Sequence, residues 1–500
     1  MSTRSSDKSS TRRILGPFNR IEGDLEVQVE VEQGTIVKAW VNSPLFRGFE
    51  QILHGKEPMD ALVYTPRICG ICSASQSVAA AQALAAAQGL QPCRNGELAT
   101  NLILAAENLA DHLTHFYLFF MPDFARQSYA NKAWFKNINE RFKAQTGTAA
   151  RQVLPARAEF LHLTGILAGK WPHSLALRPG GTTRTVEAQE KIRLLTTIIM
   201  FRTFLQDVVF GDELEQLNAL RNEEELKSWQ QSHPDSDFAK FLMVADDLEL
   251  EKLGGASNNF MSYGAYSNVG NNAEEKNNGE SDHLFKSGIW QQDYQSLNPD
   301  NIKEDITHSW LSAQSEAKHP YHGSTIVDTD EENGYSWCKA PRLNGHVMEV
   351  GAISRQMVDG HPLIRSLVAS SGANVRNRVI ARLLELSLVV PEMENWARQL
   401  QPKAPFCLPS NLPDEAQGAG MVEAARGSLG HWIRIKNGRI LNYQIIAPTT
   451  WNFSPRDSND QPGALELALQ NTYVGEDKNA SVIIQHIIRS FDPCMVCTVH

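Results

Sequence analysis

Two pairs of cysteines at opposite ends of the chain carry the strongest chemical signal in the sequence. Cys69 and Cys72 lie in the segment Arg-Ile-Cys-Gly-Ile-Cys, and Cys494 and Cys497 lie in Asp-Pro-Cys-Met-Val-Cys-Thr-Val-His. Each pair has Cys-x-x-Cys spacing, so together they offer four soft thiolates. Such a ligand set suits zinc, an iron–sulfur cluster or nickel.

The distance between the two pairs along the chain weakens the ordinary zinc interpretation. Paired cysteines of a structural zinc site usually stand roughly 15–20 residues apart, so that they close a compact knuckle. Here hundreds of residues separate the pairs, and neither lies in the β–α–β context of a thioredoxin-like redox pair. If the pairs form one site, the fold must bring both ends of the chain together.

The other three cysteines, Cys93, Cys338 and Cys407, stand alone in the sequence. An odd total of seven argues against a disulfide framework, so we expect these three to be reduced structural thiols. The cytoplasm is then the simplest compartment for this protein.

Composition excludes several classes of function. The chain has 500 residues, with 47 Lys and Arg against 57 Asp and Glu, and a net charge of −10. This acidic balance does not favour a nucleic-acid surface. Two stretches resemble membrane spans, 102–120 and 194–210, but both contain ionisable side chains, so we expect buried helices and no membrane span.

Periodicity predicts a mainly α fold with small β-sheets (α+β), in which long helices form a bundle and short sheets attach at one end. Two hairpins are expected, one around Glu32-Gln33-Gly34 and one around Asn437-Gly438. Residues 1–15 are expected to form a disordered tail, and residues 16–500 a single domain with a loop-rich surface insertion at about 223–333. The long helices are expected at 76–90, 97–120, 183–210 and 374–400.

Further motifs accompany the cysteine pairs along nearly the whole chain: Arg20-Ile-Glu22-Gly23, Arg47-Gly-Phe-Glu50, Asp111-His-x-x-His115-Phe-Tyr, Glu423-Ala-Ala-Arg426-Gly-x-Leu-Gly-His-Trp and Pro448-Thr-Thr-Trp-Asn452. In this order, and together with both Cys-x-x-Cys motifs, they resemble the large subunit of the [NiFe] hydrogenases. The insertion is the part without a clear counterpart.

The resemblance implies a buried bimetallic site where the two ends of the chain meet. All four cysteines would bind nickel; Cys72 and Cys497 would also bridge to iron, whereas Cys69 and Cys494 would be terminal ligands. The iron would carry carbon monoxide and cyanide, giving a Ni–Fe(CO)(CN)₂ centre. Dihydrogen would be cleaved heterolytically into protons and electrons, with Cys494 accepting the proton.

The same resemblance assigns roles to residues around the metals. Arg426 would lie over the open metal position as a base or a positive charge, oriented by Asp111 and Asp492. Arg426 and Thr449 would donate hydrogen bonds to the cyanide ligands. Glu22 would take the proton from the terminal thiol and begin its exit path, although without the family a solvated strand residue would be the simpler interpretation.

A second metal and several partners are also implied. Glu50, the terminal His500 and the backbone carbonyl of Ile445 would hold Mg²⁺. An iron–sulfur small subunit would accompany this chain, because all four paired cysteines are assigned to the one bimetallic site. Hydrogenase maturation proteins, and a signalling kinase if the protein is a sensor, complete the expected partners. His115 and His173 are expected to be core histidines outside the catalytic set.

The chain departs from the common family pattern at several positions. Gln76 stands where most relatives have His, and it can donate a hydrogen bond near a bridging thiolate without carrying charge. Ala425 replaces a usual Pro, and Asp24 a usual His. Ile71 and Phe119 match positions where oxygen-sensitive members commonly have Val and Leu. These larger side chains would narrow the gas channel, unless they reflect only a different packing of the core.

These departures resemble the cytoplasmic hydrogen-sensing group, so the sequence predicts an oxygen-tolerant, H₂-sensing regulatory hydrogenase. The alternative is a cytoplasmic uptake hydrogenase that feeds electrons to respiration. Two more distant alternatives are a quinone-site subunit like that of respiratory complex I, which lacks the terminal cysteine pair, and a zinc-stabilised binding module.

Overall fold

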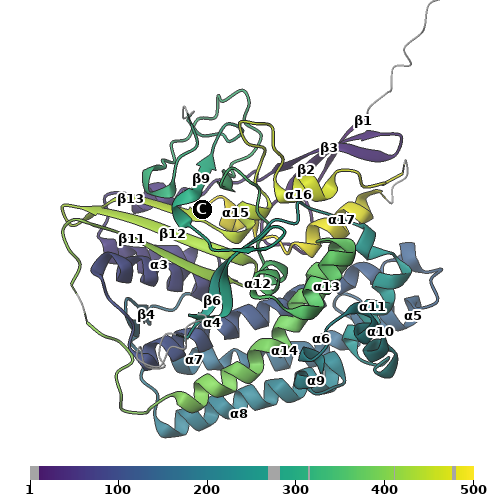
Figure 1. The fold of residues 1–500 in the computed structure, drawn as a ribbon, viewed down its shortest axis with the longest axis horizontal. Helices are drawn as coiled ribbons and strands as arrows, with labels where there is room; N and C mark the ends of the chain where they lie inside the picture. Colours follow the sequence, from purple (N-terminus) through teal and green to yellow (C-terminus); the bar gives the residue numbers. More distant parts are fainter. Residues whose placement is uncertain (1–10, 269–281, 313–315, 410, 476–479) are drawn as a thin grey trace, which may run out of the picture.

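The structure is a computed structural model that describes residues 11–268, 282–312, 316–409, 411–475 and 480–500 (Figure 1). Long helices fill one half of the molecule and small antiparallel sheets the other, which confirms the predicted fold class. The chain ends inside the molecule, where His500 is buried. One apolar core contains residues from Leu25 to Cys497. Within the described part of the chain, no helix is both long and apolar enough to cross a bilayer.

The four predicted long helices are present. Helix α14 packs against α4 and α8, and α3 packs against α4. Two of them continue beyond their α-helical bounds as single π-helical segments, at His115–Phe120 and Leu205–Phe210. The bounds are α3 (Ser73–Gln88), α4 (Arg94–Thr114), α8 (Ala188–Phe204) and α14 (Val375–Gln399).

Shorter helices surround this bundle or connect it to the sheets. They are α1 (Phe49–Leu53), α2 (Ala61–Tyr64), α5 (Phe135–Phe142), α6 (Thr148–Phe160), α7 (His162–Ala168), α9 (Leu214–Asn218), α10 (Glu223–Ser232), α11 (Asp237–Asp247), α12 (Ala352–Asp359), α13 (Pro362–Ser371), α15 (Pro448–Asn452), α16 (Ala464–Leu469), α17 (Ala480–Ser490) and α18 (Met495–Thr498).

Both predicted hairpins are confirmed, and each gains a third strand. The first sheet has the order β1–β2–β3 and the second the order β11–β12–β13. At the tip of the second hairpin, Asn437 and Gly438 both have positive φ, at 52° and 66°, as a type I′ turn requires. The bounds are β1 (Thr11–Leu15), β2 (Glu26–Glu32), β3 (Thr35–Asn42), β11 (Ala416–Ala424), β12 (Gly427–Lys436) and β13 (Arg439–Ile446).

The predicted tail is wrong for residues 11–15, which form β1 and pair with β2 from Thr11–Val31 to Leu15–Val27. This strand is largely exposed, so its stability comes from backbone hydrogen bonds to β2. A strand at a sheet edge can pair through its backbone whatever its side chains are. The polar side chains of residues 11–15 therefore gave no sign of the pairing, and the sequence was interpreted as disordered. Residues 1–10 of the predicted tail lie outside the described residues.

The predicted loop-rich insertion is also wrong in its first part, which contains α10 and α11. Both helices have side-chain caps at their N-termini. The side chain of Asn222 accepts from the amide of Glu225, and that of Ser236 accepts from the amide of Ala239. Leu226 and Trp229 are buried at helical spacing, but the surrounding charged residues concealed this short pattern.

The later part of that segment contains β6 (Phe260–Ser267), β7 (His283–Trp290), β8 (Tyr294–Gln295) and β9 (Ile302–Asp305), which pairs with β10 (Ala340–Leu343). A two-stranded pair, β4 (Leu177–Arg178) and β5 (Gly181–Thr182), lies elsewhere in the chain. Strand β6 is buried on both faces, so it lacks the apolar–polar alternation that marks a strand at a surface.

The Ala-rich helix α3 lies unusually close to β11. An added Cβ at Gly420 would stand 1.9 Å from the carbonyl oxygen of Ala79, and one at Gly418 would stand 2.1 Å from that of Ala83. Real Cβ atoms do not approach backbone so closely. The two glycines therefore permit direct contact between the helix backbone and the strand backbone.

Replacing Gly420 by Ala should lower the free energy of unfolding by at least about 2 kcal/mol, because backbone on both elements must move. Gly165→Ala is the matched control. Gly165 lies in α7 with open space around its Cα, so alanine there should be neutral or stabilising by about 0.5–1 kcal/mol. Urea unfolding measures both, and equal stability of the two variants would contradict the close packing.

Candidate metal centre

The fold brings the two cysteine pairs into one cluster. The Sγ atoms of Cys69 and Cys494 are 3.4 Å apart, those of Cys72 and Cys497 are 3.3 Å apart, and those of Cys494 and Cys497 are 3.1 Å apart. All four sulfurs lie within 4.8 Å of one another, and the four residues are buried. The predicted meeting of the chain ends at one site is thus confirmed.

Short local structures hold each pair. Cys72 directly precedes the first residue of α3, and Cys494 directly precedes α18. A parallel bridge joins Glu22 to Cys494, and the amide of Met495 donates to the carbonyl of Glu22 over 2.7 Å. The N-terminal segment therefore aligns the C-terminal one.

The electrostatics of the cluster favour metal binding. Hydrogen bonds from Cys494 and the other thiols lower the pKa of Cys69 well below its ordinary value. Contacts with the same neighbours, Cys494 first, raise the pKa of Cys72 well above its ordinary value. One thiolate is thus stabilised, whereas four like charges in one buried site require a cation. Four soft sulfurs fit nickel or another soft metal ion.

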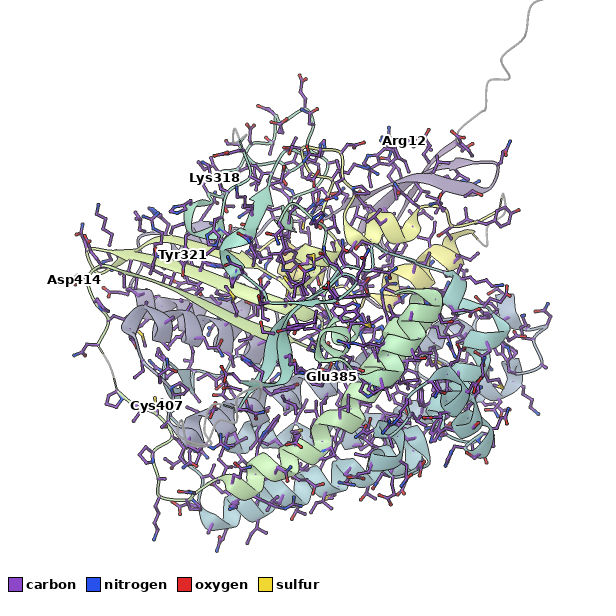
Figure 2. The ribbon with its side chains drawn as sticks, viewed as in Figure 1. Arg12, Lys318, Tyr321, Glu385, Cys407 and Asp414 are labelled. Atoms are coloured by element: carbon purple, nitrogen blue, oxygen red, sulfur yellow. The ribbon has the colours of Figure 1, made fainter. Side chains whose placement is uncertain are left out.

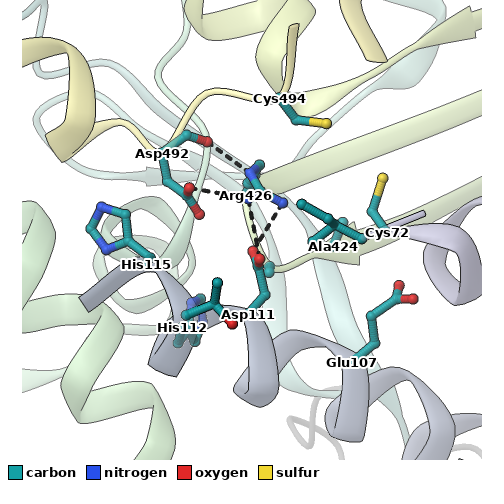
Figure 3. Close-up of polar contacts among 12 residues, drawn as sticks. Cys72, Glu107, Asp111, His112, His115, Ala424, Arg426, Asp492 and Cys494 are labelled. Carbon is teal, nitrogen blue, oxygen red and sulfur yellow. Dashed lines mark hydrogen bonds and ion pairs between the residues drawn. The ribbon is translucent and has the colours of Figure 1, made fainter. Parts of the chain in front are cut away.

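Arg426 lies beside the cluster and is held by two carboxylates (Figure 3). Its Nη2 donates to Asp111 and to Asp492, both over 3.1 Å, and its Nη1 lies 3.0 Å from the second oxygen of Asp111. Its Nε donates to the backbone carbonyl of Asp492 over 2.8 Å. The predicted orientation of this guanidinium by both aspartates is therefore present.

Both aspartates are buried, but their pKa values are shifted in opposite directions. Burial raises the pKa of Asp111 to about 8, and the neighbouring charge of Asp492 adds to this shift against the effect of Arg426. Burial also opposes ionisation of Asp492, yet the charge of Arg426 lowers its pKa below the ordinary value. Of the two aspartates, Asp492 is therefore the one that more readily carries the negative charge paired with Arg426.

A small cavity adjoins the sulfurs. Its lining includes the expected residues Ile71, Gln76 and Thr449 beside Arg426 and three of the cysteines. The hydroxyl oxygen of Thr449 accepts from the amide of Cys494 over 3.1 Å. Phe119 is half-buried in the π-helical segment and is not among the residues that line this cavity.

Glu22 is half-buried next to the cluster. Burial raises its pKa, and the negative charge of Cys69 acts in the same direction. The structure therefore places this carboxyl in an environment unlike that of the solvated strand residue considered from sequence.

Glu50 and His500 meet in a second buried site. The Nε2 of His500 is 3.2 Å from Glu50, while its Nδ1 is 2.6 Å from the carbonyl of Cys497. Ile445 donates its amide to Glu50 over 2.8 Å, whereas the sequence analysis expected its carbonyl to face a metal. Two further residues of this site were not predicted from the sequence: Lys339, which donates to Glu50 over 3.0 Å, and Glu304, 3.6 Å from Lys339.

The donor set of this second site fits a hard cation. Two buried carboxylates converge there, and burial raises the pKa of Glu304 to about 7 because Lys339 only partly compensates its charge. Neither carboxylate oxygen of Glu304 has a hydrogen-bond partner among the described residues. No sequence signal marked this residue, since it comes from β9 within the apparent insertion.

The histidines set aside from sequence are indeed tied to backbone. His115 Nε2 is 2.6 Å from the carbonyl of Arg489, and His173 Nδ1 is 2.8 Å from that of Pro66. The three solitary cysteines are free thiols, as expected. A buried carboxylate that the sequence did not reveal, Glu107, accepts from the amides of Ala74 and Ser75 at the start of α3.

Comparisons with known proteins agree with this geometry. A family model described as nickel-dependent hydrogenase matches residues 47–149 and 150–500. The periplasmic [NiFeSe] hydrogenase large subunit of Desulfomicrobium baculatum is 28% identical, over 97% of this chain and 94% of that protein. The uptake hydrogenase large subunit of Afipia carboxidovorans is 27% identical, over 99% and 96%.

Solved structures give the same result. The H₂-activated [NiFeSe] hydrogenase of Dm. baculatum has a TM-score of 0.83 and 26% identity, covering 98% of this chain and 100% of that chain. The reduced enzyme of D. vulgaris Hildenborough has a TM-score of 0.81 and 27% identity, with the same coverage. Because the family model spans most of the sequence and includes both cysteine pairs, this chain belongs to the nickel-dependent hydrogenases and is a catalytic large subunit.

Proposed function

We propose that this subunit oxidises dihydrogen reversibly at a Ni–Fe(CO)(CN)₂ centre held by the four thiolates. The observation that carries this proposal is the buried cluster of four sulfurs beside Arg426. All four thiolates would hold nickel, and those of Cys72 and Cys497 would also bind iron. When bound, the metal pair supplies the Lewis acidity that polarises dihydrogen for heterolytic cleavage.

The surrounding side chains accept the proton and supply a positive charge beside the metals. Sγ of Cys494 accepts the proton, and the carboxyl of Glu22 receives it next. The backbone bridge between these two residues and the raised pKa of Glu22 support this order. Arg426 would supply a positive charge beside the metals, and its guanidinium with the hydroxyl of Thr449 would donate to the cyanide ligands.

A Mg²⁺ ion would bind at Glu50 and His500, with Ile445 adjacent and Glu304 as a further carboxylate. The convergence of two buried carboxylates on one imidazole supports this site. Binding would replace Lys339 as the main positive charge facing Glu50.

Within the family, we place the protein among oxygen-tolerant hydrogen sensors of the cytoplasm. Ile71 in the cavity lining supports a narrowed gas channel. Phe119, which lies outside this cavity, would be a second constriction farther from the sulfurs. An iron–sulfur small subunit would take the electrons, maturation proteins would insert the metals, and a signalling kinase would receive the output. Relatives named uptake hydrogenase large subunits favour the alternative, respiratory hydrogen uptake.

Turnover separates these two roles. A sensor should oxidise hydrogen slowly with artificial electron acceptors and should alter the activity of a bound kinase when hydrogen is present. Fast turnover coupled to quinone reduction, without any effect on a kinase, would establish the uptake role.

Metal content tests the centre itself. The purified heterodimer should contain nickel and iron and should show carbonyl and cyanide bands in the infrared. Cys69→Ser should lower nickel content, because one of four thiolates is lost. Cys338→Ser is the matched control, since that buried thiol lies outside the cluster. Zinc in place of nickel, without infrared bands, would refute the proposal.

Proton transfer predicts a specific effect at Glu22. Glu22→Gln keeps size and hydrogen bonding but removes the titratable group, so hydrogen oxidation should fall about 10²-fold at unchanged nickel content. Asp24→Asn, two residues away and exposed, should have little effect. Equal rates for Glu22→Gln and the wild type would exclude Glu22 from the exit path.

The gas-channel argument concerns oxygen. Ile71→Val with Phe119→Leu should make hydrogen oxidation more sensitive to oxygen, because smaller side chains widen the passage. The control is Ile103→Val with Phe135→Leu, which makes the same two reductions in side-chain size at positions other than the two proposed constrictions. Inhibition assays at graded oxygen concentrations measure the difference, and unchanged inhibition would count against the channel.

A further inference from the structure

A fully buried arginine, Arg355 on α12, holds the backbone that presents Arg426. Its guanidinium makes five hydrogen bonds, which is the full donor capacity of an arginine. Two go to Glu385, over 3.0 and 2.8 Å, and one to Glu423 over 2.8 Å. The other two go to backbone carbonyls, those of Ala424 over 2.9 Å and Ala425 over 3.2 Å.

Those two carbonyls belong to the turn between β11 and β12. Ala424 pairs with Gly427, so Ala425 and Arg426 form a two-residue turn. Gly427 has φ 129°, and a Cβ there would stand 2.6 Å from the amide nitrogen of Gly351, just before α12. The turn therefore lies directly against α12, and Arg355 fixes its position through both residues that precede Arg426.

A second contact of Arg355, with Glu385, leads to the helix that carries Asp111. Glu385, which lies inside the fold on α14 (Figure 2), is 3.2 Å from Nε2 of His112. His112 is the neighbour of Asp111 on α4, and Asp111 binds the guanidinium of Arg426. The carboxylate of Glu385 thus connects the clamp on the turn to the helix that carries the orienting aspartate.

We propose that Arg355 is a positioning residue for hydrogen oxidation: it sets the place of Arg426 over the thiolate cluster by clamping the carbonyls of Ala424 and Ala425. This inference rests on the hydrogenase function and not on the sensing role. The competing interpretation is that Arg355 forms an ordinary buried ion pair, which stabilises the fold without affecting the reaction.

A matched control distinguishes these interpretations. Arg342 is also buried, with hydrogen bonds to Asp457 and to the carbonyls of Pro341 and Gln461, and it does not line the cavity beside the cysteines. Arg342→Gln should therefore lower stability and leave kcat unchanged. Arg355→Gln should lower kcat about 10²-fold with unchanged KM for hydrogen, because a misplacement of about 1 Å has that cost.

A second variant covers the risk that Arg355→Gln fails to fold. Arg355→Lys keeps the charge between Glu385 and Glu423 but has three donors where arginine has five. It cannot satisfy both carboxylates and both carbonyls, so kcat should still fall, about 10-fold or more. Wild-type kcat in Arg355→Lys would overturn the proposal.

A crystal structure of metal-free Arg355→Lys provides a readout independent of the loaded enzyme. The turn at Ala425 should shift, and Arg426 should lose its contact with Asp111, whereas both should stay in place in metal-free Arg342→Gln. An unmoved Arg426 would overturn the proposal even if activity fell. Absence of hydrogenase activity in the wild type would refute the function instead, and leave this structural comparison valid.

Discussion

The direct contact between α3 and β11 is the constraint on which the metal centre depends. Helix α3 begins immediately after Cys72, and β11 ends two residues before Arg426. Since Gly418 and Gly420 have no side chains, the two backbones touch, and the distance between the two elements is fixed by atoms that cannot change rotamer. The first cysteine pair and the arginine are thereby brought to one place by a rigid unit, to which the C-terminal segment adds the second pair.

The buried ionisable side chains around this unit are stable only because they pair with one another. Arg355, Glu385, Glu423, Arg426, Asp111 and Asp492 are all buried. An isolated buried charge costs several kcal/mol, and removing one partner of a buried pair is more damaging than removing both. Rigid placement of Arg426 follows, because its guanidinium is held at once by Asp111 and by the side chain and backbone carbonyl of Asp492. A preorganised charge of this kind needs no reorganisation while the reaction proceeds.

The features that could be predicted from the sequence are those with a local sequence pattern, either a motif of reactive residues or a regular spacing of apolar residues. The cysteine spacing, the Asn437-Gly438 turn and the long helices are such features, and the structure contains each of them. Prediction from the sequence failed for contacts between distant segments that no local pattern encodes. Strand β1 pairs through its backbone despite polar side chains, and Arg355 and Glu304 acquire their partners only through the tertiary fold.

Gln76, which stands where the family resemblance led us to expect His, takes its physical role from its hydrogen-bond partners. Oε1 of Gln76 can only accept, so Nε2 of His431, 2.8 Å away, must donate, and Nδ1 of His431 accepts from the hydroxyl of Tyr443. Burial lowers the pKa of His431 to about 3. The imidazole is therefore neutral at physiological pH, like the amide and the hydroxyl to which it is hydrogen-bonded. A neutral amide in a fixed orientation thus stands beside Cys72 where an imidazole could change its charge. The hydrogen-bonded residues Gln76, His431 and Tyr443 therefore stay neutral across physiological pH, so charge changes beside Cys72 are left to the carboxyl groups of the same cavity, such as Asp111.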